Sequence, residues 1–456
     1  SAEMHTTIYS ISESPRDPKQ IWVGTDDGNV QLTRDGGEHW TNLTRNIKGL
    51  PAASWVSWVE ASPSQAGTAY AVFDRHSFGD MTPWAYRTTD FGRSWTRIVS
   101  PQQGVRGYAH VIKEDPAAPN VLYLGTEFGL WFSVDAGASW AGFKGSNFPA
   151  VAVRDIVVQP RDGDLVIATH GRGIWVIDDL APLRALTPEA RASEVAFLPV
   201  RPTQQRISGS GGWAEGDAKF SGQNPPAGAV ISYYQKTRHV FGRLKLEILD
   251  PAGKVIDTLP ASKRKGINRV VWLMQMPPPR VPTAAQPAFS AAQGPRLLPG
   301  TYTVRLTKAG KVYETQLPIV LDRRAAFTVE DRKAQFDASM RAYALFGRMT
   351  DLAERLAGLK TLAEERQAAA KLNKSAAELA GKFAASADTL RKEIVATKEG
   401  GAITGEERLR EHLDDVYGAL TSYEGRPGDY QVARVEALER ELKDVEDRTA
   451  ALVRDE

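Results

Sequence analysis

Three stretches of the chain share one pattern: TRDGGEHW at 33–40, TTDFGRSW at 88–95 and SVDAGASW at 133–140. Each has serine or threonine first, then aspartate, glycine and tryptophan at fixed spacing. The aspartate can accept hydrogen bonds from backbone N–H groups of its own turn, and the glycine can take a positive φ. The pattern predicts a hairpin turn between two strands, followed by a large ring buried between neighbouring sheets.

Two further elements recur around these turns. A run with β propensity ends at a proline each time: IYSISESP (8–15), VSWVEASP (56–63), AHVIKEDP (109–116) and RDIVVQP (154–160). A second run follows it: IWVGTDDG (21–28), TAYAVFDR (68–75), VLYLGTEFG (121–129) and LVIATHGRG (165–173). Successive copies of the eight-residue pattern begin 45–55 residues apart. A repeat of this length predicts one four-stranded propeller blade per unit, at about 5–45, 53–99, 107–145 and 150–180. The fourth unit is incomplete, because it lacks the aspartate turn.

The repeated octapeptide resembles the Asp-box, or BNR, repeat of sialidase-like and sortilin-like β-propellers, over about residues 1–180. The resemblance implies that the motif residues are structural: Asp35, Gly37, Trp40, Asp90, Gly92, Trp95, Asp135, Gly137 and Trp140. The order of the whole chain is similar to exported bacterial BNR-repeat proteins labelled as glycosyl hydrolases or sortilin-like proteins. It implies a periplasmic or extracellular location, although no signal peptide is visible in this chain.

The sequence as a whole predicts a mainly β protein with an α-helical tail. Residues 1–180 form the blades, and 181–226, rich in Pro, Gly and Ser, form a linker or wrapping segment. Residues 227–325 resemble an immunoglobulin-like or FlgD-like β-sandwich. Within it, the Pro- and Ala-rich insert 277–298 is expected to be a mobile loop. Residues 326–456 carry helical periodicity and form a helical hairpin or bundle.

The opening strand suggests that blades are missing. The chain begins at the first strand of a blade, and an open stack would leave exposed sheet edges. We therefore expect upstream blades as partners, on an N-terminal part or on a separate chain. The alternative is a closed four-bladed ring completed by 181–226.

Composition narrows the classes of function. The 456 residues carry a net charge of +2 and no cysteine, which excludes thiol chemistry and gives no reason to expect a nucleic-acid partner. No apolar run is long enough for a membrane span, and no motif indicates a cofactor or a metal site. The charged helix faces are those of a solvated surface, with a coiled-coil partner or homo-oligomer through the helices as the alternative.

The loops between the second and third strands of the blades share one rim of the propeller. They place polar and aromatic residues there that suit a glycan or peptide ligand. The predicted ligand-binding residues are Asp74, Arg75, His76, Phe128, His170 and Arg172. The alternative is a glycoside hydrolase, which needs two carboxylates. Asp26 or Asp27 with Glu127 are its candidates, but a complete catalytic set is not visible, so binding is favoured over catalysis.

Overall fold

The computed structural model describes residues 6–145, 147–199, 202–207, 225–370, 373–398 and 406–454. The chain divides into two compact units. One unit holds residues 1–201 with 232–238 and 264–268, and the other holds 202–231, 239–263 and 269–456. Each unit is described by itself below.

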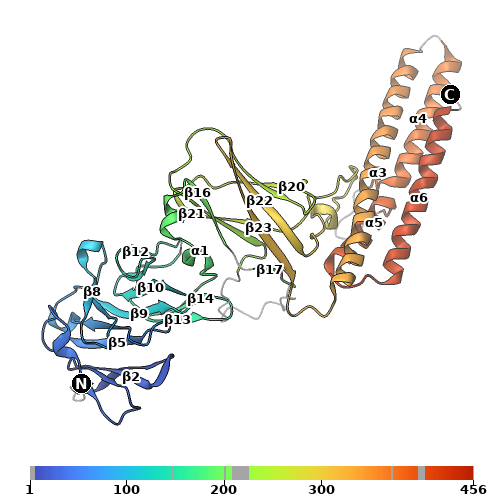
Figure 1. Cartoon of the computed structure of the whole chain (residues 1–456). Helices are drawn as coiled ribbons and strands as arrows, with labels where there is room; N and C mark the ends of the chain where they lie inside the picture. Colours follow the sequence, from blue (N-terminus) through green and yellow to red (C-terminus); the bar gives the residue numbers. More distant parts are fainter. Residues whose placement is uncertain are drawn as a thin grey trace. The chain divides into compact units, whose positions relative to one another are not determined.

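The first unit is a stack of antiparallel sheets, which confirms the predicted propeller blades (Figure 1). Blades 1, 2 and 3 have four strands each and blade 4 has three in the described residues. The strands are β1 (Ile8–Ser14), β2 (Asp17–Thr25), β3 (Val30–Thr33) and β4 (Thr41–Asn42); β5 (Trp55–Ala61), β6 (Ala69–Asp74), β7 (Trp84–Thr88) and β8 (Thr96–Val99); β9 (Ala109–Asp115), β10 (Ala118–Thr126), β11 (Gly129–Ser133) and β12 (Ala141–Gly142); and β13 (Val153–Gln159), β14 (Asp164–Thr169) and β15 (Ile174–Ile177).

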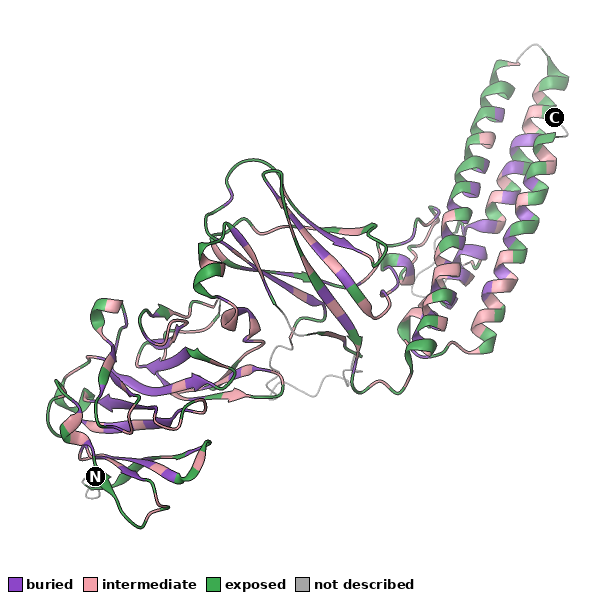
Figure 2. Ribbon diagram, viewed as in Figure 1, coloured by how far each residue is buried: buried purple, intermediate pink, exposed green. Residues whose placement is uncertain are grey.

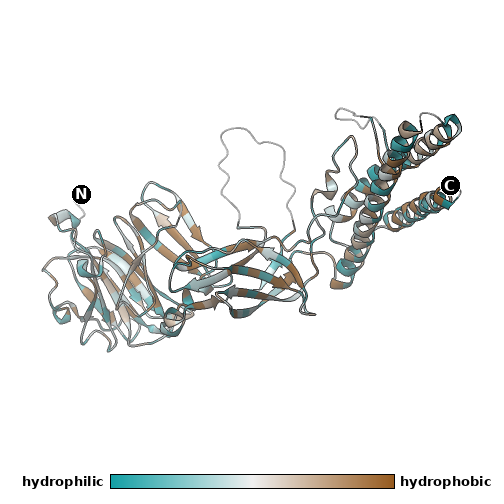
Figure 3. Ribbon diagram, turned by 90° about the horizontal axis from the view of Figure 1, so that it is seen from above, coloured by the Kyte–Doolittle hydropathy of each residue, from teal (hydrophilic) through white to brown (hydrophobic). Residues whose placement is uncertain are grey.

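Successive blades bury their apolar faces against one another. Alternate residues of β6 point to opposite faces: Ala71 and Phe73 join the core shared with blade 1, whereas Tyr70 and Val72 join the core shared with blade 3. Brown hydrophobic stretches therefore follow the strands in Figure 3, and most of these stretches are buried in Figure 2.

The three aspartate–glycine–tryptophan turns, called DGW turns here (33–40, 88–95 and 133–140), are built alike. In each turn the first hydroxyl donates to the aspartate, at 2.7, 2.8 and 2.8 Å. The same hydroxyl accepts from the glycine N–H at 2.9, 2.9 and 2.8 Å. The glycines have φ of +106°, +77° and +90°, which other residues reach only with strain. Sequence alone therefore determines the local turn.

The turn alone does not determine whether its tryptophan is buried. The expectation that all three tryptophans are buried is wrong for Trp40. Trp95 and Trp140 are 9% and 8% exposed, but Trp40 is 44% exposed. Trp95 packs edge-on against Trp22 of blade 1 at 6.0 Å, and Trp140 donates to the Ile98 carbonyl of blade 2. Each buried ring thus rests on the preceding blade, and no blade among the described residues precedes Trp40.

Two further sheets form a β-sandwich. One has the order β16 (Val195–Leu198), β18 (Ala229–Gln235) and β21 (Gly266–Trp272); the other has β17 (Thr203–Gln205), β23 (Lys311–Leu321), β22 (Gly300–Lys308), β19 (Leu244–Leu249) and β20 (Val255–Leu259). Trp272 packs edge-on against Tyr302 at 5.4 Å, so β21 faces β22. Strands β16 and β17 lie before the predicted boundary at residue 227. Two short helices, α1 (Ala181–Arg184) and α2 (Pro188–Ala192), precede them.

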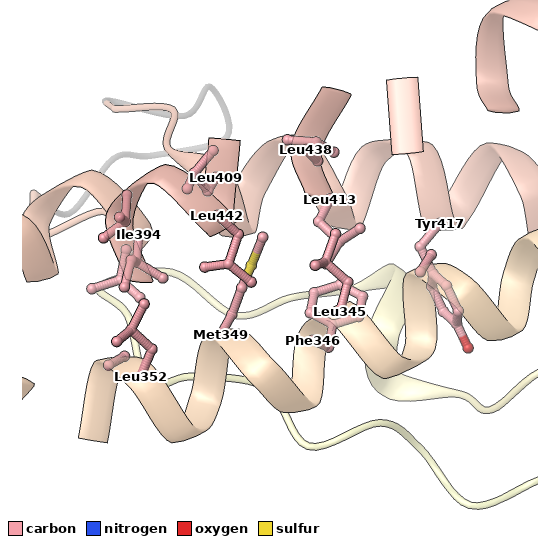
Figure 4. Close-up of a cluster of buried hydrophobic side chains, with 14 of the residues drawn as sticks. Leu345, Phe346, Met349, Leu352, Ile394, Leu409, Leu413, Tyr417, Leu438 and Leu442 are labelled. Atoms are coloured by element: carbon pink, nitrogen blue, oxygen red, sulfur yellow. The ribbon is translucent and has the colours of Figure 1, made fainter. Parts of the chain in front are cut away.

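Four helices follow the sandwich in the described residues: α3 (Val329–Ala369), α4 (Lys374–Ile394), α5 (Leu409–Ser422) and α6 (Asp429–Arg454). The α3 helix begins with a capping pair, Thr328 with Asp331. Leucines from all four helices meet Phe346 and Met349 in one core, part of which is drawn in Figure 4. No described helix combines the length and the apolar character needed to cross a membrane.

The insert 277–298 is ordered, contrary to the expected mobile loop. It lies across the helices as a strap: Val281, Ala284, Ala288 and Ala291 pack into their core. Asp414 accepts from the N–H groups of Ser290 and Ala291 at 3.2 and 2.8 Å. Composition missed this because the partners lie far away in sequence: Thr350 is 70 residues from Arg280, and Asp414 is 124 residues from Ser290.

Candidate functional site

A buried carboxylate at the end of β6 organises the polar part of the blade rim. Asp74 is fully buried, and its Oδ1 accepts from the His76 N–H at 2.9 Å and lies 2.7 Å from His76 Nδ1. Burial alone would raise the pKa of Asp74, but the imidazole of His110 and the bonds from His76 outweigh it and lower that pKa. Asp74 is therefore a fixed anion, and it directs Nε2 of the half-exposed His76 away from itself.

His110, on β9, lies between Asp74 and a cation. Its Nδ1 is 3.6 Å from Asp74 Oδ2 and 3.2 Å from Nη1 of Arg154 on β13. Because a guanidinium only donates, His110 Nδ1 accepts when it bonds Arg154; with its proton on Nδ1 the ring instead donates to Asp74, a contact that lowers the pKa of Asp74. His110 therefore has two mutually exclusive partners.

Arg154 connects the histidine to a second carboxylate. Its Nη2 donates to the Tyr108 hydroxyl at 2.9 Å and lies 3.7 Å from Glu127 Oε2. Burial and a hydrogen bond with Glu127 raise the pKa of Tyr108 to about 12. Gly107, at φ +78°, allows this approach, because a Cβ there would lie 3.0 Å from Cβ of Glu127.

Aromatic rings surround these polar groups. The rings of His76 and Tyr108 stack with their centroids 4.8 Å apart. The centroid of the Trp55 ring lies 6.3 Å from those of His76 and His110. Tyr9 of blade 1 packs edge-on against Trp55 at 4.6 Å. We call the polar residues the Asp74 cluster. Its members are Asp74, His76, Tyr108, His110, Glu127 and Arg154.

The structure brings together some of the residues predicted from sequence. Asp74, His76 and Glu127 all belong to the Asp74 cluster, and Phe128 beside Glu127 is exposed. His170 and Arg172 are exposed on blade 4, and Trp175 donates to the Arg172 carbonyl.

Arg75 has a structural role in its loop. Its guanidinium donates to Ser54 Oγ at 2.9 Å and to the Ala52 carbonyl at 3.1 Å, and it pairs with Asp80 at 3.3 Å. These contacts join the 51–54 segment to the loop after β6, so the side chain is already engaged.

The catalytic candidates of blade 1 lie in their own turn. Asp26 Oδ1 accepts from the Thr7 N–H at 2.8 Å, and Asp27 contacts the Thr25 hydroxyl and the Asn29 amide. Glu127, their proposed partner, belongs to the Asp74 cluster instead. Neither aspartate contacts Glu127 in the structure.

Sequence reasoning missed Trp55, Tyr108, His110 and Arg154. No local motif contains them, because they come from three different blades. The repeat nevertheless carries a signal. Counted back from the proline that ends each first strand, Tyr9, His110 and Arg154 occupy one position, and Trp55 and Tyr108 occupy the position two residues earlier. The start of every first strand thus faces the rim.

One group of described residues has the donor set for a metal ion. Ligand atoms of Asp35, Glu38 and His39 all lie within 4.8 Å of one another. Both oxygens of Asp35 already bind inside the DGW turn, to the Thr33 hydroxyl and to the backbone and ring of His39. This arrangement fits a hydrogen-bonded turn better than a metal centre.

Comparisons with known proteins give partial matches. No protein-family model matches the chain. A curated relative, the oligoxyloglucan-reducing end-specific xyloglucanase of Emericella nidulans, is 31% identical over 108 residues. That match spans 24% of this chain and 13% of the relative's length.

Two solved structures illustrate the likeness in three dimensions. The GH74 xyloglucanase from Xanthomonas campestris is 16% identical, with 74% of this chain and 47% of that chain covered and a TM-score of 0.31. YCF48 bound to D1 peptide is 20% identical, with 38% and 51% covered and a TM-score of 0.29. These TM-scores are low, so the fold assignment rests on the sheets and repeats of the chain itself.

Proposed function

We propose that the chain binds a glycan at the Asp74 cluster. The observation that carries this proposal is the row of charged and polar groups from Asp74 through His110 and Arg154 to Glu127, spaced 3.6, 3.2 and 3.7 Å apart, drawn from three blades and surrounded by rings. Sugar hydroxyls both donate and accept, and these groups offer both roles. Exposed rings such as Phe128 supply apolar surface for the C–H faces of a sugar. The 108-residue match to a xyloglucanase supports a glycan over the alternative ligand, a peptide.

Glycoside hydrolysis is the second candidate, favoured by the same match. It requires a proton donor and a second carboxylate. Glu127 is half-buried beside Tyr108 and Arg154, and Asp26 or Asp27 would supply the other carboxylate. Asp74 is poorly suited to act as the acid, because its pKa is lowered and it stays ionised. Binding without catalysis therefore remains our first proposal.

The family of the propeller, its cellular location and its association state are also proposals. The three DGW turns support membership among Asp-box propellers, and the resemblance to exported BNR-repeat proteins supports a periplasmic or extracellular location. Association of two copies through the helices stays a prediction.

Titration calorimetry with xyloglucan oligosaccharides tests glycan binding. We expect Glu127→Gln and Arg154→Ala to weaken binding at least about tenfold, since hydrogen bonds to charged groups are worth about 1.5–3 kcal/mol. Glu13→Gln, an equivalent change on the exposed part of β1, is the matched control and should bind like the wild type. Absence of binding by the wild-type chain, or full affinity in both cluster variants, would contradict the proposal.

The same samples separate binding from hydrolysis. Binding without new reducing ends supports our first proposal. Release of reducing ends that Glu127→Gln abolishes would establish the hydrolase instead. Full activity after substitution of Asp26, Asp27 and Glu127 together would exclude those three residues as its catalytic set.

A further inference from the structure

The joint between blades 1 and 2 follows a definite plan. Blade 1 supplies two side chains just after its fourth strand. Leu43 packs where a Cβ on Gly92 would be, and Asn46 Nδ2 donates to the Gly92 carbonyl at 2.8 Å. Blade 2 supplies the glycine of its DGW turn and the buried Trp95. The joint therefore has a donor half on the preceding blade and an acceptor half on the following one.

The joint between blades 2 and 3 repeats this plan. Ile98 packs against Gly137. A Cβ added to Gly137 would lie 3.0 Å from the Cβ of Ile98. Gln103 Nε2 donates to the Gly137 carbonyl at 3.1 Å, and Trp140 donates to the Ile98 carbonyl at 2.8 Å. Each donor half thus combines one aliphatic side chain with one amide.

Blade 1 carries an acceptor half of the same form that no described residue covers. A Cβ on Gly37 would meet nothing within 4 Å, and Trp40 is exposed. Ile11 is 65% exposed on the same side. The hydroxyls of its neighbours Ser10 and Ser12 accept from the N–H groups of Val59 and Ala61 in blade 2, at 2.9 Å each. Because side chains alternate along a strand, Ile11 points to the opposite face of β1, away from blade 2.

We infer that this face, defined by Ile11, Gly37 and Trp40, docks a further four-stranded blade. The docking blade carries a leucine or isoleucine at the end of its last strand or just after it, followed by an asparagine or glutamine. These residues fill the space at Gly37 and donate to its carbonyl, and the blade buries Trp40 and Ile11. The recognition chemistry is that of the two joints already present in the molecule.

The described blades of a second copy do not supply the occupant. Its donor halves at 43–46 and 98–103 are engaged by blades 2 and 3. The segment after β12 is also engaged, because Phe148 packs against Trp175 of blade 4 at 5.4 Å. Blade 4 has three strands in the described residues and continues into α1. None of the described blades is therefore free to dock on this face.

The absence of cysteine allows a direct test. A copy of residues 5–52, which carries Leu43 and Asn46, is fused ahead of residue 5 of the full chain. The chain also carries Ile11→Cys in its original blade 1. We expect maleimide labelling of this cysteine to slow at least about tenfold in the fusion. The control Phe78→Cys, at an exposed position of blade 2, should label equally in both proteins.

Two further proteins make the result decisive. Leu43→Asp with Asn46→Ala in the fused copy should restore fast labelling. A fused copy of 53–104, with Ile98 and Gln103, should protect the cysteine again. Fast labelling in both fusions overturns the inference. Protection that appears in the unfused chain as its concentration rises, together with dimers in light scattering, overturns it in favour of a second copy.

Discussion

The DGW turns of blades 1 and 2 share backbone hydrogen bonds to their first hydroxyl and their aspartate but have different surroundings. Asp35 and Asp90 accept the same hydroxyl and the same backbone N–H four residues on, at 3.0 and 2.9 Å for the latter. Yet Trp40 is exposed and Trp95 is buried. The motif therefore encodes the turn, whereas burial of its tryptophan depends on a neighbouring blade.

The largest expected effect separates the two tryptophans. Trp95→Ala should lower the free energy of unfolding of the blades by about 3–5 kcal/mol, because it opens a cavity against Trp22 and Leu43. Trp40→Ala is the matched control and should change it by about 0.5 kcal/mol or less. Urea unfolding followed by circular dichroism measures both values. Equal losses would show that the turn, not the neighbouring blade, supplies the stabilisation.

The strap at 277–298 contains no motif, and its order likewise depends on contacts with distant residues. Asp414→Ala on α5 should lower the stability of the helices by about 1–3 kcal/mol, because the Ser290 and Ala291 N–H groups lose their acceptor. Limited proteolysis should then cut the strap sooner. Asp415→Ala, at the exposed neighbouring residue, is the control. Unchanged cleavage in Asp414→Ala would mean that apolar contacts alone hold the strap.

These regions show what sequence can predict. The repeat predicted the blades and the turn at Asp35, Asp90 and Asp135, because those hydrogen bonds join residues at most a few positions apart. Burial of Trp40, order in the strap and the place of His110 in the rim depend on contacts between distant segments. For the rim, aligning the repeats would have helped, whereas nothing in the strap's composition indicates its partners.

The smallest expected effect tests whether the two turns are locally equal. Hydrogen bonds from the Ser94 hydroxyl and N–H lower the pKa of Asp90 to about 2, and the His39 N–H and Thr33 hydroxyl also lower the pKa of Asp35. The unfolded state, with an ordinary pKa of about 3.9, then binds more protons than the folded state. The contribution of Asp90 is therefore fully present above about pH 4 and is lost as pH falls towards about 2.

Asp90→Asn should remove that part of the pH dependence, seen as a flatter plot of urea midpoint against pH below about pH 4. Asp35→Asn should flatten the plot in the same direction, although Trp40 and Trp95 differ in burial. Because both carboxylates are exposed enough for water to screen them, each change should be smaller than that of Trp95→Ala. A flatter plot for Asp90→Asn alone would mean that the neighbouring blade also shapes the turn itself, and the separation of local from tertiary effects would fail.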